Sequence, residues 1–179
     1  ETGLEGFTVE NFGMTVGSKG WEQATPVATT LNSKPWAPGT AGAGTKALVT
    51  WNGVAGGAAT ASDLDGGPTI ATSPVVDLSA VPHPILSYKR WFANDDTLSS
   101  EGDALVVQVT NDGSNWVTLE TVNTHGENLW RSVSFDLADI LPLTATMQVR
   151  FSIADAPDNS VTEAAIDAVV ITGGSCPVS

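Results

Sequence analysis

Residues 147–153 read Met-Gln-Val-Arg-Phe-Ser-Ile, a stretch in which large apolar and polar side chains alternate without a break. Because successive side chains of a β-strand point to opposite faces of a sheet, this alternation predicts a strand with one face buried and the other in contact with water. Half-buried strands of this kind are typical of antiparallel sheets. The stretch therefore predicts an all-β fold whose antiparallel sheets pack through one face.

Strand signals recur along much of the chain. Residues 103–110 and 115–122 predict a hairpin around residues 111–114, Asn-Asp-Gly-Ser, because Asn, Asp and Gly tolerate the positive φ of a tight turn. The one helix-like stretch, 137–141, is short and is stopped by Pro142. Further strands are predicted at 7–11, 46–51, 69–72, 84–92, 129–136 and 164–172.

Residues 17–68 are rich in Gly, Ala, Thr and Pro, and their strand signals are weak. We interpret them as long loops that lie over one end of a two-sheet sandwich. A chain of 179 residues is long enough for one large domain with a real core, so we expect a single domain over residues 1–173. Residues 174–179 are expected to form a C-terminal linker.

The charge balance narrows the choice of partners. The chain has 20 acidic and 7 basic residues, which give a formal charge of -13. Nucleic-acid binding needs clustered Lys and Arg, so we expect no nucleic-acid partner. We also expect no membrane insertion, because no apolar run approaches the roughly 18 residues of a membrane helix. Clustered carboxylates favour a divalent cation that neutralises their repulsion, and a solvated acidic surface is the alternative.

The strongest local signal is the segment 63–67, Asp-Leu-Asp-Gly-Gly. Alternate aspartates followed by glycines suit Ca²⁺, because the carboxylates of Asp63 and Asp65 can point into one bend that the glycines allow to fold tightly. The segment is not an EF-hand, since Pro74 stands where the bidentate glutamate should be and the flanks are not helical. A plain turn is the alternative interpretation.

Other acidic residues are candidate metal ligands beside the predicted strands. Glu163 and Asp167 are four residues apart, which places both on one face of a strand. Asp167 lies in an otherwise apolar strand, where an unpaired buried carboxylate would be costly. Either a metal ion or a hydrogen-bond network must compensate for it. The remaining candidates next to strands are Asn94, Asp95 and Asp103.

Signals for catalysis are weak. The two histidines, His83 and His125, do not have the spacing of a zinc site, and no Gly-x-Ser-x-Gly motif occurs. Paired carboxylates can catalyse glycoside hydrolysis, but here they have Gly and Asp neighbours, which suit a metal ion better than a general acid. We therefore expect a protein that is not an enzyme. A hydrolase that uses Glu163 or the Asp63 and Asp65 pair is the weakest hypothesis.

Six tryptophans are a second resource for binding. Trp36 and Trp51 are the candidate ligand-binding residues, because exposed aromatic rings of sugar-binding modules stack on pyranose rings. Trp36 lies between Pro35 and Pro38, which stiffen its loop. The alternative is that both rings pack down and cover the end of the sandwich. The other four tryptophans, which we predict to belong to the core, are Trp21, Trp91, Trp116 and Trp130.

Several segments, in this order along nearly the whole chain, resemble a MAM-like jelly-roll module of large secreted bacterial proteins of the planctomycete type. The segments are 62–67, 73–79, 86–95, 107–113, Trp116-Val117, 149–151 and 163–167.

The resemblance implies a two-sheet antiparallel jelly-roll sandwich with long loops and structural Ca²⁺. It also implies that an N-terminal carboxylate meets Asp167 of the last strand, and Glu1 has this role if residues 1–3 are native. Where the family commonly has a second acidic residue, this chain has Ala168 and therefore one fewer candidate ligand.

These observations lead to two hypotheses about function. The first is a calcium-stabilised, non-catalytic adhesion or interaction module of a secreted or cell-surface protein, carried within a larger chain. The alternative is a carbohydrate-binding module that targets a polysaccharide-active enzyme. The expected partners are Ca²⁺ and either a glycan or another protein surface.

Overall fold

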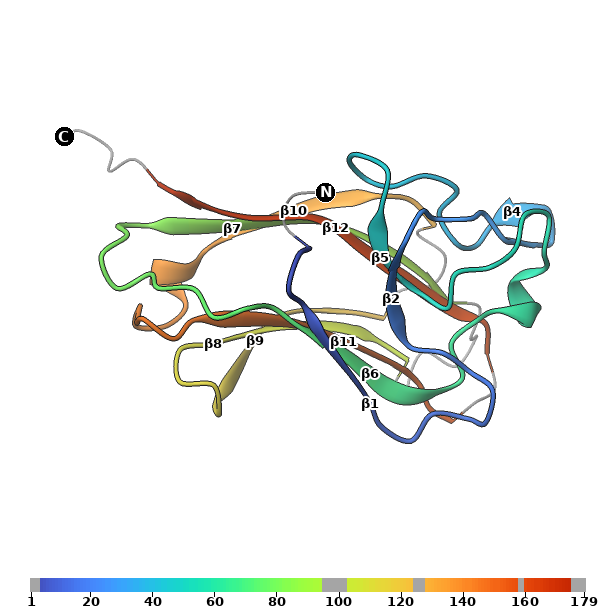
Figure 1. Cartoon of the computed structure of the whole chain (residues 1–179), viewed down its shortest axis with the longest axis horizontal. Coiled ribbons are helices and arrows are strands. Elements are labelled where there is room, and N and C mark those ends of the chain that lie inside the picture. Colours follow the sequence, from blue (N-terminus) through green and yellow to red (C-terminus); the bar gives the residue numbers. More distant parts are fainter. Residues whose placement is uncertain (1–3, 95–102, 124–127, 158–159, 175–179) are drawn as a thin grey trace.

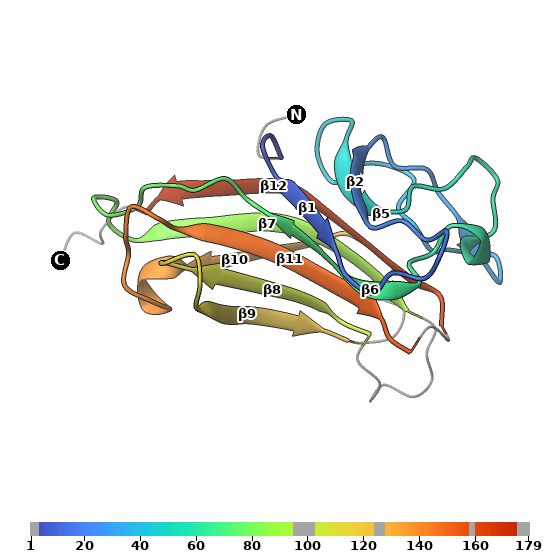
Figure 2. The ribbon, with the colours of Figure 1, turned by 60° about the horizontal axis from the view of Figure 1, so that its bottom comes forward.

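The computed structural model describes residues 4–94, 103–123, 128–157 and 160–174. Two five-stranded antiparallel sheets pack face to face in a flattened sandwich, as Figures 1 and 2 show. The fold is the all-β, two-sheet jelly-roll sandwich with long loops that the sequence predicts. Among the described residues, no helix is long and apolar enough to span a membrane.

Both sheets contain strands that are distant in sequence. Sheet A contains, in spatial order, β1 (Thr8–Asn11), β6 (Gly66–Thr72), β11 (Gln148–Asp155), β8 (Leu105–Thr110) and β9 (Trp116–Val122). Sheet B contains β10 (Arg131–Asp136), β7 (Pro84–Asn94), β12 (Thr162–Gly173), β5 (Ala47–Thr50) and β2 (Trp21–Ala24). The short elements are β3 (Thr30–Leu31), β4 (Lys34–Pro35), η1 (Ala59–Ala61) and η2 (Leu137–Asp139).

β11 occupies the centre of sheet A, where it pairs with β6 on one side and β8 on the other. Its residues Val149, Phe151 and Ile153 are buried, as the alternation in the sequence predicts. Across the interior, the ring of Phe151 meets the ring of Tyr88 from β7 edge to face, with 5.3 Å between the ring centroids. This arrangement favours an aromatic pair, so β11 and β7 join the two sheets in the middle of the core.

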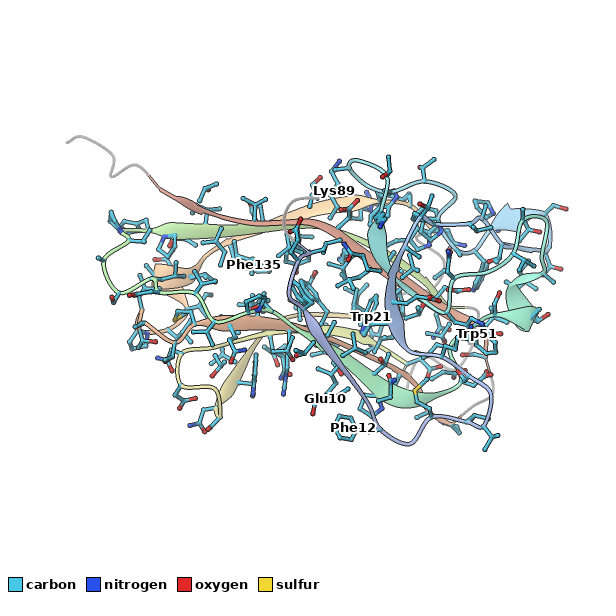
Figure 3. The ribbon with its side chains drawn as sticks, in the orientation of Figure 1. Glu10, Phe12, Trp21, Trp51, Lys89 and Phe135 are labelled. Atoms are coloured by element: carbon cyan, nitrogen blue, oxygen red, sulfur yellow. The ribbon has the colours of Figure 1, made fainter. Side chains whose placement is uncertain are left out.

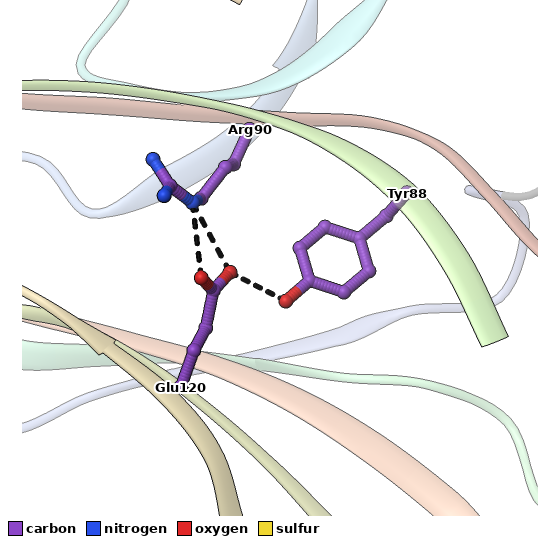
Figure 4. A network of polar contacts seen from close by, with 3 residues as sticks. All are labelled: Tyr88, Arg90 and Glu120. Atoms are coloured by element: carbon purple, nitrogen blue, oxygen red, sulfur yellow. Dashed lines mark hydrogen bonds and ion pairs between the residues drawn. The ribbon is translucent and has the colours of Figure 1, made fainter. Parts of the chain in front are cut away.

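A polar contact also crosses the interior, and Figure 4 shows it from close by. Glu120 of β9 in sheet A accepts hydrogen bonds from the hydroxyl of Tyr88 and from Nε of Arg90, both on β7 of sheet B. The side chains of Arg90 and Glu120 are 13% and 17% exposed. Burial raises the pKa of Tyr88, and its hydrogen bond to Glu120 raises it further, so the phenol keeps its proton. We call this group the interior clamp.

The outer face of sheet B is half covered by a third layer formed from the segments on either side of β5, residues 25–46 and 51–61, as Figures 1 and 2 show. Outward-pointing side chains of the covered half pack into two small apolar clusters. The clusters contain Trp36, Ala59, Ala93 and Val161 in one case, and Ala47, Val49, Trp91 and Ala165 in the other. Over β10 and the adjoining parts of β7 and β12, Figure 1 shows no such layer.

The prediction of loops through residues 17–68 was wrong at β2 and at the β3–β4 hairpin. β2 pairs with β5 at the edge of sheet B, although its four residues, Trp-Glu-Gln-Ala, are too few for an alternating pattern to be recognised. Trp21 is 5% exposed, points between the sheets in Figure 3, and donates its backbone N–H to Thr69 Oγ1 of β6 at 3.1 Å. Contacts distant in sequence therefore stabilise this strand.

Candidate functional site

Buried polar residues gather at the end of the sandwich where β7 and β11 finish and β12 begins. Asn94, at the end of β7, donates from Nδ2 to Asp103 Oδ2 at 3.2 Å and to Thr162 Oγ1 at 3.3 Å. Ser160 Oγ lies 2.9 Å from the same Asp103 oxygen and 3.2 Å from Asp155 Oδ1. This group, which we call the polar end, brings together the predicted ligands Asn94 and Asp103, and it includes Asp155, which the sequence reasoning missed.

Glu163 lies next to this group and is only 1% exposed. Its Oε2 accepts a hydrogen bond from Thr50 Oγ1 at 3.2 Å, whereas Oε1 has no hydrogen-bond partner among the residues that the structure describes. Burial raises the pKa of Glu163 well above its ordinary range, and the charge of Asp63 raises it further. Asp63 is held nearby because the N–H of Leu64 donates to the carbonyl of Thr162 at 3.0 Å.

The bend at residues 63–67 is as tight as its glycines predict. Gly66 and Gly67 have φ values of +78° and +117°. A Cβ atom on Gly66 would lie 2.5 Å from the carbonyl oxygen of Gly13, so no larger residue fits. Asp65 is half-buried, and its backbone N–H donates to Ser18 Oγ at 2.9 Å. The segment before β2 therefore holds this bend in place.

The predicted metal ligands do not all meet at one point. Glu163 and Asp167 are four residues apart on β12, which corresponds to about 13 Å along a strand. Within the described ranges, no three His, Cys, Asp or Glu side chains are arranged to hold a metal ion. Glu1 and Asp95 lie outside the described residues. The metal-binding roles of all these residues stay predictions. The charge of Asp63 contributes to the raised pKa of Glu163, so these two carboxylates lie near each other.

Asp167 is 2% exposed and takes part in a hydrogen-bond network, the alternative to a metal ion considered above. Its Oδ2 accepts from the backbone N–H of Ala43 at 2.7 Å, and its Oδ1 accepts from the N–H of Ala168 at 2.6 Å. Ala168 has φ +50° and sits in a β-bulge of β12. The carboxylate of Asp167 therefore ties residues 40–46, which we call the latch loop, to sheet B.

Two further side chains fasten the latch loop. Lys89 of β7 donates from Nζ to the carbonyl of Gly42 at 2.6 Å, and Trp130 donates from Nε1 to the carbonyl of Thr40 at 3.0 Å. A Cβ atom on Gly42 would come within 3.1 Å of Lys89 and 3.2 Å of the Trp130 ring, so the loop approaches both residues closely. Figure 3 shows Lys89 on the outer side of sheet B.

For Trp36, the alternative interpretation, in which the ring packs down onto the sandwich, is the one that the structure supports. Trp36 is 6% exposed and donates from Nε1 to the carbonyl of Val161 at 3.0 Å, so its ring packs inward and is not available for stacking. Trp51 is half-buried. Trp21 and Trp91 are buried, as predicted for core residues. Trp116 and Trp130, also predicted for the core, are half-buried. Trp130 packs against the apolar cluster that contains Trp91, whereas the Trp116 ring lies 4.1 Å from the Arg150 guanidinium.

A hollow of about 280 Å³ opens on the outer face of sheet B, and no sequence motif marked it. We call it the serine hollow. It lies over β10, β7 and the bulge of β12, beside the latch loop. Tyr88 and Val133 supply its floor through their main chain, because their side chains point into the core. The other lining residues are Ser87, Lys89, Ser132, Ser134 and Ala168.

The strand register explains the polarity of this face. Ser132, Lys89 and Asp167 form one row across β10, β7 and β12. Ser134, Ser87 and Val170 form the next row across the same strands. In the part of the chain that the structure describes, the hydroxyls of Ser87, Ser132 and Ser134 make no hydrogen bond. The serine hollow therefore presents three unused hydroxyl groups on a rigid sheet.

Comparison with known proteins supports the fold. No known protein family matches the sequence, and no curated protein does. A solved structure of carbohydrate-binding modules from the β-sandwich superfamily has a TM-score of 0.52 at 16% identity, over 94% of this chain and 58% of that chain.

Two further solved structures are less similar. The K1 cleaved adhesin domain of Lys-gingipain from Porphyromonas gingivalis W83 has a TM-score of 0.49 at 16% identity, over 97% of this chain and 96% of that one. The CBM22-1 xylan-binding domain from Paenibacillus barcinonensis Xyn10C has a TM-score of 0.41 at 11% identity, over 96% and 87%. At such identities a likeness concerns the fold alone, and the two-sheet sandwich is what the first match supports.

Proposed function

We propose that this chain is a calcium-stabilised, non-catalytic binding module of a secreted or cell-surface protein. The observation that carries the proposal is the buried carboxyl group of Glu163, which has an unpartnered oxygen and faces the charge of Asp63. Two buried carboxylates repel each other unless a proton or a cation neutralises them. Ca²⁺ takes six to eight oxygen ligands, including backbone and side-chain carbonyls, so two carboxylates are enough to begin a site.

Asp63 and Glu163 would hold the ion, and neutral oxygens would complete its coordination. The bound ion would supply positive charge that neutralises both carboxylates. It would also connect β12 to the bend before β6, since Glu163 belongs to the strand and Asp63 to the bend. The role of Ca²⁺ is therefore structural, and the binding surface lies elsewhere on the module.

The burial of the acidic residues also supports a non-catalytic role. A general acid or nucleophile must reach the substrate, and the carboxylates named in the hydrolase hypothesis are poorly placed for this. Glu163 is 1% exposed and Asp63 is 7% exposed. Asp65 is half-buried, its backbone N–H donates to Ser18 Oγ, and its carbonyl accepts from the N–H of Thr15. A module that holds a partner fits this arrangement better than a hydrolase.

The resemblance to MAM-like modules of secreted bacterial proteins favours adhesion to another protein surface as the wider role. A carbohydrate-binding module is the second candidate, and the serine hollow is the observation that favours it. In both cases we propose that the domain is one unit of a larger extracellular chain.

A calcium melt tests the proposal. Melting temperatures are compared in chelator and in excess Ca²⁺, with Mg²⁺ as the control ion. We expect a clear rise with Ca²⁺, since free ligand at 100 times its dissociation constant stabilises by about 2.7 kcal/mol. Glu163→Gln removes one charge with little change in shape, and we expect it to abolish most of the rise. An unchanged melting temperature in the wild-type chain would refute the calcium proposal.

A further inference from the structure

The serine hollow is built from small outward side chains on three neighbouring strands. Ser132 and Ser134 come from β10, Ser87 from β7 and Ala168 from the bulge of β12. Large side chains would fill this space. Because the floor is paired main chain of β10 and β7, the shape of the depression is set by the strands themselves.

The latch loop is bonded to Lys89, one of the lining residues of the hollow, and helps to fix its position. Lys89, Asp167 and Trp130 each hold a different backbone group of this loop, so it is fastened to all three strands or their ends. A rigid site loses little conformational entropy when a ligand binds. The hollow is therefore pre-formed, as small-molecule sites usually are.

The chemistry of the lining favours a ligand rich in hydroxyl groups. Each serine hydroxyl can donate one hydrogen bond and accept others, and the three hydroxyls of the hollow make none to another residue that the structure describes. A sugar ring offers the same mixture of donors and acceptors around its edge. At about 280 Å³, the hollow is slightly smaller than most small-molecule sites, which suits one ring of a longer chain.

The apolar contacts and the charge around the hollow also suit a neutral sugar. Val170 is 42% exposed and stands in register beside Ser87, so it offers apolar contact to the C–H face of a ring. The formal charge of -13 repels acidic polymers, and the ammonium group of Lys89 is already bonded to the latch loop. A neutral polysaccharide fits this electrostatic environment better than an acidic one.

On the basis of the proposed binding function, we propose that the serine hollow is a glycan-binding subsite that takes one pyranose ring of a neutral polysaccharide. The hydroxyls of Ser87, Ser132 and Ser134 bond the ring edge, and the ring packs against Val170. The hollow is open on its outer side, so the rest of the polysaccharide extends along the bare half of sheet B (Figure 1).

Affinity electrophoresis tests this inference. The full chain is run with Ca²⁺ through native gels that contain hydroxyethylcellulose, xylan, galactomannan or the acidic polymer polygalacturonate. Ser134→Trp fills the hollow, and a triple variant (Ser87→Ala, Ser132→Ala, Ser134→Ala) removes the hydroxyls with little added bulk. Ser114→Trp, at an exposed turn of sheet A, is the matched control.

We expect retardation by at least one neutral polymer, with affinity at least tenfold lower for Ser134→Trp and severalfold lower for the triple variant. Ser114→Trp should bind like the wild type, and polygalacturonate should not retard any of them. Failure of the wild type to bind every neutral polymer, or unchanged affinity in both hollow variants, overturns the inference. The calcium melt of the same samples is independent of these gels, so a calcium shift without glycan binding leaves the proposed function standing.

Discussion

At the scale of single residues, Glu163 is the side chain whose environment is hardest to explain without a ligand. A buried ionised carboxylate normally has several hydrogen bonds, but one oxygen of Glu163 has none in the described part of the chain. Thr50 satisfies only the other oxygen. The carboxyl group must therefore carry either a proton or a cation, and these two states respond in opposite ways to pH.

The protonated state makes a prediction for the calcium-free chain. The folded-state pKa of Glu163 is raised above the unfolded value of about 4.3, so the folded state binds more protons between the two values. The free energy of unfolding in chelator should fall as the pH rises through that window. Glu163→Gln should remove this loss, so its stability relative to wild type should increase from pH 5 to pH 8. Urea titrations at both pH values measure this, and parallel curves would contradict it.

A different prediction concerns Asp167, whose carboxylate accepts hydrogen bonds from two backbone N–H groups. Asp167→Ala leaves the N–H groups of Ala43 and Ala168 without their acceptor, which should lower the free energy of unfolding by about 1–3 kcal/mol. The loss should be the same in chelator and in Ca²⁺, as thermal melts in both conditions can show. If the calcium shift disappears in Asp167→Ala, Asp167 is a ligand and not only an anchor of the latch loop.

The sequence predicted the stiffness of the Trp36 loop but not the direction of its ring. Pro35 and Pro38 limit the local backbone, which is a property of neighbouring residues. The burial of the ring depends on Val161, which is 125 residues away in the sequence. The serine hollow could not be predicted from local sequence for the same reason. Ser87 and Ser132 belong to separate strands, and only the strand register brings them together.

At the scale of elements, the long alternating strands were predictable because each carries its own signal. β11 and β12 were both found at nearly their observed positions. β2 was missed because its pairing with β5, and not its four residues, makes it a strand. The bulge in β12 was equally invisible, since a residue with positive φ at Ala168 has no local sequence signal.

The bend before β6 gives a prediction at this scale. Gly66→Ala places a Cβ atom 2.5 Å from the carbonyl oxygen of Gly13 at a φ of +78°, so the bend cannot keep its shape. We expect a loss of well over 1 kcal/mol in the free energy of unfolding from urea denaturation. Gly113→Ala is the matched control. Its φ is +75°, but only a side-chain oxygen of Gln148 lies within 4 Å. An equal loss in both variants would show that the positive φ alone, and not the close approach to the Gly13 carbonyl, causes the loss of stability.

At the scale of the whole molecule, the acidic chain folds into three layers. Sheet A, sheet B and the layer of residues 25–46 and 51–61 each bury apolar surface, yet the main core lies only between the sheets. The third layer is attached by small clusters and by hydrogen bonds such as those of the latch loop. The stability of the polar end and of the third layer therefore depends more on individual hydrogen bonds than the stability of the central core does. The proposed calcium ion, held by Asp63 and Glu163, would add to the contacts in this part of the molecule.

The interior clamp gives the prediction that concerns both sheets at once. Glu120 joins sheet A to Arg90 and Tyr88 of sheet B, and all three side chains are mostly buried. Glu120→Met should lower the free energy of unfolding by about 1–3 kcal/mol, because it removes the acceptor of the Tyr88 hydroxyl and of Arg90 Nε. Arg90→Met alone should also destabilise, and the double variant should lose less than the sum of the two. A double-mutant cycle in urea measures the coupling, which we expect to be about 0.5–3 kcal/mol. A coupling near zero would mean that apolar packing alone holds the sheets together and that the ion pair contributes nothing to their association.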